Sequence, residues 1–246
     1  MSESHLGLGL LCVGLAALAN LVGGILVTLR DWDDRLLRFA IALGAGFMLA
    51  AVILKMVPES QRLTSAAPVL VLAGYLLVHL FEHTVAPHFH FGEETHPELL
   101  VSARAGVSAL LGLVVHSFFD GISIGSAFII DRALGLLVFT AIVLHKAPEG
   151  FAIASVVLAT RGSRRSALLA AAAVGGASIL GGFSIFGMQT LVGPALAVSA
   201  GVTLYVAASD LVPEVNRDQG VGIALTVFLG VLLYYATERM LDALGL

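Results

Sequence analysis

Apolar residues form long unbroken runs along this chain instead of alternating with polar ones. An α-helix needs about 20 apolar residues to cross the hydrocarbon core of a membrane, and the sequence holds eight such stretches. They cover residues 6–29, 36–57, 66–87, 101–130, 133–160, 166–191, 194–213 and 221–244. Strands of a membrane barrel would alternate apolar and polar residues. The pattern predicts an all-α membrane protein with eight transmembrane helices in a single domain, residues 1–246.

The composition supports a lipid-facing exterior. The chain is 58% hydrophobic and only 12% charged, whereas soluble domains carry about 25% charged residues. The net charge of -4 is small and comes without a basic block, so the lipid bilayer is the expected partner and nucleic acid is not. The first apolar stretch has no basic segment before it and no small-residue cleavage site, which predicts a retained helix and not a signal peptide. One cysteine, Cys12, excludes an intramolecular disulfide framework.

The arginines predict the orientation of the helices. Eight fall on one side: Arg30, Arg35, Arg38, Arg104, Arg161, Arg164, Arg165 and Arg217. Three fall on the other: Arg62, Arg132 and Arg239. Because positive residues concentrate on the cytoplasmic side, both termini are expected to face outside. The short chain without long loops is typical of a bacterial protein, which predicts the cytoplasmic (inner) membrane.

An internal repeat accompanies this layout. Residues 44–59 match residues 199–214 without a gap. The two copies lie in the second and seventh predicted helices, so they run in opposite directions, as in the inverted repeats of secondary transporters. This predicts a 3+2+3 arrangement, with helices 4 and 5 in the centre. A chance likeness between small-residue helices that end in Pro-Glu remains the alternative.

The central two helices carry polar residues deep in apolar sequence. His116 and Asp120 are four residues apart in stretch 101–130, and His145 and Glu149 have the same spacing in stretch 133–160. Four-residue spacing puts each histidine and carboxylate on one helix face. Two nitrogens and two carboxylate oxygens suit a divalent first-row cation, zinc in particular. The alternative is two buried histidine–carboxylate hydrogen bonds that lock helix packing.

A proline stands beside this second pair. Pro148 lacks a backbone donor and crowds the carbonyl of Leu144. The sequence therefore predicts that the helix opens next to His145, as discontinuous transporter helices do.

His116-Ser-Phe-Phe-Asp-Gly and His145-Lys-Ala-Pro-Glu-Gly resemble the paired signature of the ZIP (Zrt/Irt-like) family of divalent metal transporters, in its bacterial type. The resemblance covers nearly the whole chain. It implies metal uptake towards the cytoplasm, an elevator-type motion, a homodimer, and a metal site formed by His116, Asp120, His145 and Glu149. Zn²⁺ is then the transported substrate and not a cofactor. Fe²⁺, Mn²⁺, Co²⁺ and Cd²⁺ tolerate the same ligands.

The chain departs from the family pattern at several of these positions. Ser117 stands where asparagine is usual, and Lys146 where aspartate is common in members that bind two metals. Asp120 replaces the more common glutamate, and Phe119 replaces a proline, which predicts a straighter helix. Lys146 is expected to pair with Glu149 and Asp120 and to limit the site to one metal. The alternative is that Lys146 snorkels or faces a water-filled gap.

Further residues are candidates for the metal path. Met48 falls where some bacterial members place a thioether ligand, although a flexible core filler is the favoured interpretation. A release path towards the cytoplasm would use residues at the inner ends of helices 3 and 7 and in the loop after helix 3: His83, His88, His90, His96 and Asp210. A solvated polar loop is the alternative for the loop histidines.

Two other function classes compete with a metal carrier. An intramembrane metalloenzyme would need an activated water and a general base, typically in His-Glu-x-x-His, and the chain lacks that motif. Four protein ligands would also fill the position that a catalytic zinc keeps open. A proton-coupled carrier of an organic solute would use the same residues as a relay. The sequence favours the metal carrier, which is not an enzyme.

Overall fold

The computed structural model describes residues 3–29, 34–84, 103–159, 163–213 and 221–245, and all regular structure within them is helical. The elements are α1 (Glu3–Leu29), α2 (Asp34–Ala51), η1 (Val52–Met56), α3 (Val57–Leu63), α4 (Ala67–Thr84), α5 (Ala103–Ile130), α6 (Arg132–Ala159), α7 (Arg164–Gly187), η4 (Gln189–Leu191), α8 (Val192–Tyr205), η5 (Val206–Leu211) and α10 (Val221–Ala243). Seven helical stretches are long and apolar enough to span a membrane, and α4 adds the shorter apolar segment Ala67–Phe81. The predicted all-α membrane fold is confirmed.

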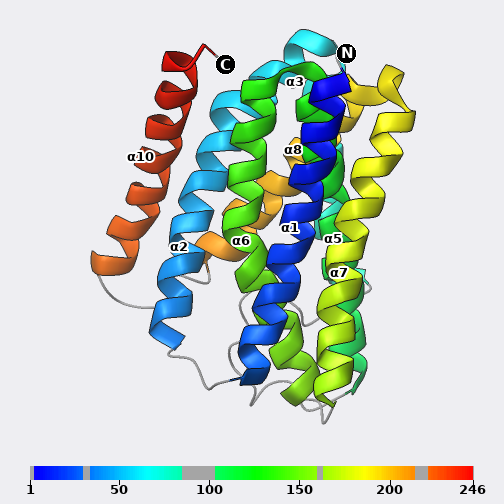
Figure 1. Ribbon diagram of the computed structural model, residues 1–246, viewed down its shortest axis with the longest axis vertical. Helices are drawn as coiled ribbons and strands as arrows, with labels where there is room; N and C mark the ends of the chain where they lie inside the picture. Colours follow the sequence, from blue (N-terminus) through cyan, green and yellow to red (C-terminus); the bar gives the residue numbers. More distant parts are fainter. Residues whose placement is uncertain (1–2, 30–33, 85–102, 160–162, 214–220, 246) are drawn as a thin grey trace.

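Four helices form a bundle that we call the central bundle: α1, α5, α6 and α7, each of which contacts the other three. Outside it, α2 packs on α10 and α4 packs on α8, and these two flanking pairs reach the bundle through contacts of α2 with α6 and of α8 with α5. The N-terminal end of α1 and the C-terminal end of α10 lie at the same end of the molecule (Figure 1).

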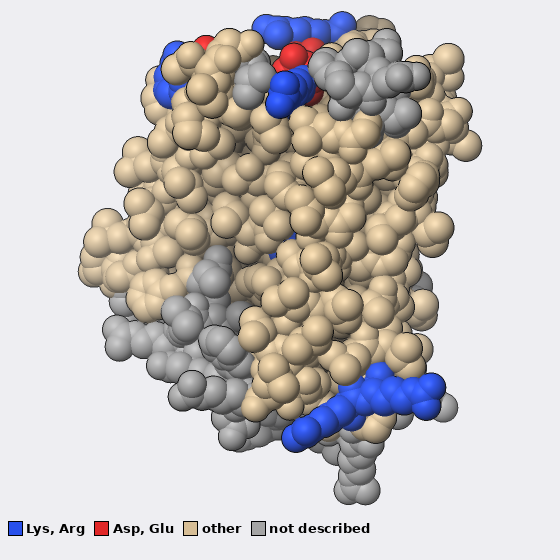
Figure 2. Space-filling view, viewed as in Figure 1, with Lys and Arg blue, Asp and Glu red and all other residues tan. Residues whose placement is uncertain are grey.

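The surface of the molecule matches a lipid environment. Large apolar side chains stand exposed along α1, among them Leu11, Leu15 and Leu18, and along α10, among them Phe228 and Leu232. In the view of Figure 2, most Lys and Arg side chains lie at the two ends, and a broad belt separates them that is uncharged apart from one small basic spot near its middle. Such a belt is what the hydrocarbon core of a bilayer requires. The protein is therefore a multi-pass membrane protein.

The flanking pairs are locked by close backbone contacts at glycines. A Cβ atom at Gly46 in α2 would overlap the backbone of Val227 in α10, and one at Gly230 in α10 would overlap the backbone of Leu43. The pair α4/α8 has the same two contacts: Gly74 against Val198, and Gly201 against Val71. Helices in lipid associate by such close packing of small residues, because apolar side chains gain nothing by leaving lipid tails.

Two helices that the sequence predicts as uninterrupted contain a π-helical turn. In η1 the N–H of Val57 bonds to the carbonyl of Val52, and in η5 the N–H of Val212 bonds to that of Ala207. A proline follows each of these donors. Proline lacks an N–H and crowds the carbonyl four residues before it, so a wider turn with five-residue bonds accommodates it. After η1 the chain stays helical through α3, beyond the predicted end.

The predicted opening of the helix beside His145 is not found. The helix α6 runs from Arg132 to Ala159 with Pro148 inside it. A proline in a membrane helix is tolerated where neighbouring helices cover the carbonyl that it leaves unbonded. Here α2 packs close to this carbonyl: a Cβ atom added at Gly44 would lie 3.7 Å from the carbonyl oxygen of Leu144. The helix α5, with Phe119 inside, is likewise a single element.

An apolar cluster joins the central bundle to its flanks. Cys12 and Ile124, from α1 and α5, are buried in one cluster with Val52 and Met56 of η1 and Leu196 of α8. Cys12 is a free thiol that is only 4% exposed.

Candidate metal centre

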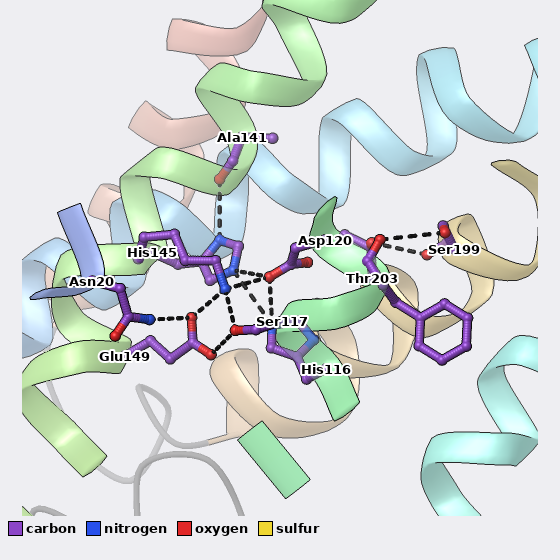
Figure 3. A network of polar contacts seen from close by, with 11 residues as sticks. Asn20, His116, Ser117, Asp120, Ala141, His145, Glu149, Ser199 and Thr203 are labelled. Atoms are coloured by element: carbon purple, nitrogen blue, oxygen red, sulfur yellow. Dashed lines mark hydrogen bonds and ion pairs between the residues drawn. The ribbon is translucent and has the colours of Figure 1, made fainter. Parts of the chain in front are cut away.

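The helices α5 and α6 bring the four predicted ligands to one point inside the central bundle. One nitrogen or oxygen atom from each of His116, Asp120, His145 and Glu149 lies within 4.8 Å of the other three. All four side chains are buried, the most exposed being His116 at 5%. Figure 3 shows them pointing towards one another from the two helices. Among the residues that the structure describes, no other group of three or more His, Cys, Asp or Glu side chains could hold a metal.

The two imidazoles face the same carboxylate. The Nε2 atoms of His116 and His145 are 3.4 Å apart. They lie 3.1 Å and 3.3 Å from Oδ2 of Asp120. Because the i,i+4 spacing in α5 stacks His116 over Asp120, one helix alone supplies a nitrogen and an oxygen that could bind a metal, and α6 adds a second nitrogen.

The two ring nitrogens of His145 have different neighbours. Nδ1 lies 3.2 Å from the carbonyl oxygen of Ala141, one turn earlier in α6. Nε2 lies 3.3 Å from Oδ2 of Asp120 and 3.4 Å from Nε2 of His116. A histidine that contacts a backbone carbonyl with one nitrogen and turns the other towards a buried polar centre has the orientation of metal-binding histidines.

Lys146 closes the site from the side of α6. Its Nζ lies 2.6 Å from Oδ2 of Asp120 and 2.5 Å from Oε2 of Glu149. It also donates to Oγ of Ser117 at 2.6 Å, and Ser117 in turn donates to Oε1 of Glu149 at 2.6 Å. Lys146 has no exposed surface, so the alternative in which it snorkels is wrong. The expected pairing with both carboxylates is found.

One member of the site, Asn20 of α1, is not among the residues predicted from the sequence. Its Nδ2 donates to Oε2 of Glu149 at 3.1 Å, and its side chain is fully buried (Figure 3). A lone amide in a helix with no second polar residue nearby gave no spacing to interpret. Its position deep in an apolar stretch, where polar groups are costly, is the signal that could have found it. We call the connected set the polar centre: Asn20, His116, Ser117, Asp120, His145, Lys146 and Glu149.

The remaining candidates lie elsewhere. Met48 is fully buried in an apolar cluster that also holds Leu113 and Ala141, which agrees with its interpretation as a core residue. His83 is exposed on α4, with its Nδ1 2.8 Å from the carbonyl of His79. The side chain of Asp210 and the loop residues His88, His90 and His96 lie outside the part that the structure describes.

A helical membrane bundle with a buried centre of two histidines and two carboxylates has the features expected of a membrane transporter that handles a cation. Comparison with known proteins gives the same class. The family model for the ZIP zinc transporters matches residues 92–238. The chain is 27% identical to the zinc transporter ZIP9 of Xenopus tropicalis, over 95% of this chain and 85% of that protein. It is 30% identical to the zinc transporter ZupT of Escherichia fergusonii, over 81% of this chain and 83% of that protein.

The chain therefore belongs to the ZIP family of divalent metal transporters. In such a protein zinc is the transported substrate and not a cofactor. The resemblance that the two motifs carry in the sequence is confirmed.

Proposed function

We propose that this protein takes up divalent metal, zinc in the first place, through the polar centre. The observation that carries the proposal is the convergence of four buried ligand atoms from α5 and α6 within 4.8 Å. Two nitrogens and two carboxylate oxygens fit the tetrahedral preference of zinc, and the carboxylates neutralise its charge where water cannot. Fe²⁺, Mn²⁺, Co²⁺ and Cd²⁺ are competing substrates that the same ligands accept.

The metal moves inwards, with both termini outside. The excess of arginines at one end supports this orientation; of these, Arg164 and Arg165 lie at the start of α7. The likeness to ZupT of Escherichia fergusonii supports a bacterial cytoplasmic membrane. Release would pass His83, Asp210 and the loop histidines His88, His90 and His96, which tune the rate.

The site holds one metal per protomer. Asp120 and Glu149 together with Lys146 leave one uncompensated negative charge, which a single divalent ion converts into one positive charge. A second ion would raise the charge by two more in a medium that does not screen it. Lys146 bonds both carboxylates and so acts as a built-in cation in place of a second metal.

An elevator-type motion carries the substrate. All members of the polar centre belong to α1, α5 and α6, which are parts of the central bundle. The flanking pairs α2/α10 and α4/α8 bind each other through their own glycine contacts. This division supports movement of the bundle as one body against the flanks.

The inverted 3+2+3 repeat underlies that division. The contacts of Gly46 and Gly230 in α2/α10 correspond to those of Gly201 and Gly74 in α4/α8. The π-helical turns η1 and η5 also fall at matching places in the repeat. Residues 1–246 then form one transport domain, and the functional unit is a homodimer, whose mass in detergent can be measured by light scattering.

The alternatives are an intramembrane metalloenzyme and a proton-coupled carrier of an organic solute. Both use a buried histidine–carboxylate group, but neither requires net movement of zinc. All curated relatives compared above are zinc transporters by name, which supports the carrier.

The experiment is uptake of radiolabelled zinc into proteoliposomes that contain the purified protein. We expect saturable uptake that unlabelled zinc suppresses and that His145→Ala removes. Competition by the other divalent metals gives the order of preference. Zinc that binds but never crosses would contradict the proposal, and so would uptake by His145→Ala at the wild-type rate.

A further inference from the structure

Asn20 reaches the metal centre from a helix that carries none of the four ligands. It belongs to α1, and its amide Nδ2 donates to Oε2 of Glu149 at 3.1 Å. The other oxygen of that carboxylate accepts from Ser117, at 2.6 Å. Glu149 is thus oriented by an amide from one neighbouring helix and a hydroxyl from another, in addition to Lys146.

The backbone keeps Asn20 at this distance. A Cβ atom at Gly150, directly after Glu149, would overlap the carbonyl of Asn20. A Cβ atom at Gly23 in α1 would overlap the backbone of Ala147 and Phe151 in α6. The two helices therefore touch through their main chains on both sides of the Asn20–Glu149 hydrogen bond, and the amide of Asn20 is held in place next to the carboxylate.

The same backbone contact recurs between α5 and α7, next to the other carboxylate. A Cβ atom at Gly121, directly after Asp120, would overlap the carbonyl of Ser178. A Cβ atom at Gly181 in α7 would overlap the backbone of Phe118 in α5. The backbone of Ser178 therefore packs against the residue after Asp120, as the backbone of Asn20 packs against the residue after Glu149.

Ser178 and Asp120 also carry complementary polar atoms. Oγ of Ser178 and Oδ1 of Asp120 are buried, and neither finds a hydrogen-bond partner among the described residues. Both side chains are fully buried. Buried polar atoms of native proteins are nearly always paired, so a hydroxyl donor and a carboxylate acceptor on neighbouring helices point to a bond that forms in another state of the site.

We propose that Asn20 and Ser178 are positioning residues for the two metal-binding carboxylates. Asn20 orients Glu149 by donating to it. Ser178 donates to Oδ1 of Asp120 when the metal takes the place of Lys146 at Oδ2. The inference rests on the proposed function, since it assigns these two residues to the same site. Hydrogen bonds behind a ligand fix its direction, and their loss typically lowers metal affinity by about 10- to 100-fold.

The direction of the Asn20 hydrogen bond allows a sharp test. Asn20→Ala removes the donor, whereas Asn20→Asp keeps the size of the side chain and, where its carboxyl is ionised, offers only acceptors to Glu149. If Asn20 acts as a donor, both substitutions weaken zinc binding, and aspartate weakens it more. If the free Oδ1 of Asn20 were instead a metal ligand, aspartate would strengthen binding.

The experiment measures the zinc Kd of the purified protein by calorimetry, and KM and kcat for zinc uptake in proteoliposomes. The variants are Asn20→Ala, Asn20→Asp and Ser178→Ala. Matched controls on the same helices are Thr28→Val and Ser184→Ala, whose hydroxyls only donate to Ile25 and Gly181 of their own helix. We expect Kd and KM to rise by about 10-fold or more in the three variants and to stay unchanged in the controls.

Several results would overturn the inference: wild-type Kd in Asn20→Ala and Ser178→Ala, tighter binding in Asn20→Asp, or a loss of thermal stability without a change in Kd. If Asn20→Ala does not fold, Ser178→Ala decides, because it removes a single oxygen. The variant Glu149→Ala distinguishes failure of the positioning role from failure of the proposed metal site. Wild-type zinc binding in Glu149→Ala would contradict the site itself, whereas lost binding there with unchanged binding in Asn20→Ala would contradict only the positioning role.

Discussion

Two helix interfaces of this protein are held together by different interactions: the one between α5 and α6, and the one between α2 and α10. The first contains charged groups that touch one another, with Lys146 between Asp120 and Glu149. The second is held by main-chain contacts at Gly46 and Gly230 and by an edge-on ring contact of Phe47 with Tyr234, centroids 5.5 Å apart.

The two interfaces are expected to have different roles: the charged one serves metal handling, and the glycine one holds helices together. Charged groups inside a membrane are costly and persist where they are paired and used, whereas close packing of small residues needs no charge at all. A substitution in the polar centre should therefore change metal handling, and a substitution at the glycine contacts should change stability alone.

The largest effect is expected for Glu149→Ala. It removes a proposed metal ligand and leaves Lys146 with one carboxylate, so zinc uptake should be abolished while the protein remains inserted and folded. Uptake in proteoliposomes and the elution profile in detergent check both points. The control is Glu238→Ala, a carboxylate of α10 that pairs with Lys55 at 3.6 Å. Near-normal uptake by Glu149→Ala would mean that the polar interface between α5 and α6 has no special role in zinc transport.

A large effect on stability is expected for Lys146→Met. Two carboxylates would stay buried without their cation, and breaking a buried ion pair costs about 3–5 kcal/mol. Zinc supplies the missing charge, so it should raise the unfolding temperature of Lys146→Met by more than that of the wild type. Thermal unfolding with and without zinc measures this. An unchanged unfolding temperature would show that Lys146 does not balance the carboxylates. The one-metal proposal is tested on the wild type by calorimetric stoichiometry, where two tightly bound metals would refute it.

A smaller effect, on stability only, is expected for Gly46→Ala. The added methyl group would overlap the carbonyl of Val227, which cannot move without shifting α10. Overpacking of this kind costs about 1–3 kcal/mol, and the zinc Kd of the folded protein should not change. Gly14→Ala is the matched control, since among the described residues no atom of another helix lies within 4 Å of a Cβ added there. Equal stability of the two variants would mean that the glycine contacts do not hold the flanking pair.

The smallest effect is expected for the histidines that follow the third predicted span. Replacing His88, His90 and His96 together with serine should lower the uptake rate moderately and leave transport measurable, because weak hydrated sites tune release. The initial rate in proteoliposomes is the measurement. Complete loss of uptake in a folded triple variant would move the essential ligands away from the polar centre.

The helices could be predicted from the sequence because a membrane span needs a long apolar run, which hydropathy alone detects. The π-helical turns could not, since Pro58 and Pro213 allow either a break or a widened turn, and packing decides between them. Pro148 is also a proline within a predicted span, but it lies inside an uninterrupted α-helix.

The candidate ligands could be predicted because His116 with Asp120 and His145 with Glu149 share one spacing along the chain. The contact of Asn20 with Glu149 could not be predicted, because the two residues are 129 positions apart and only the approach of α1 to α6 brings them together. The repeated spacing pointed to residues of α5 and α6, and no spacing related a residue of α1 to them.

The burial of Cys12 gives the wild-type protein a thiol whose rate of chemical labelling depends on how the surrounding helices pack. The chain has a single thiol, and that thiol lies where the central bundle meets η1 and α8. If the bundle moves as proposed, a displacement of one helical turn, about 5.4 Å, would shift Cys12 relative to the residues of η1 and α8 in its apolar cluster and change its shielding. A membrane-permeant thiol reagent would then label the wild-type chain at different rates before and after that motion, and the proposal could be tested without an engineered cysteine or a cysteine-free background.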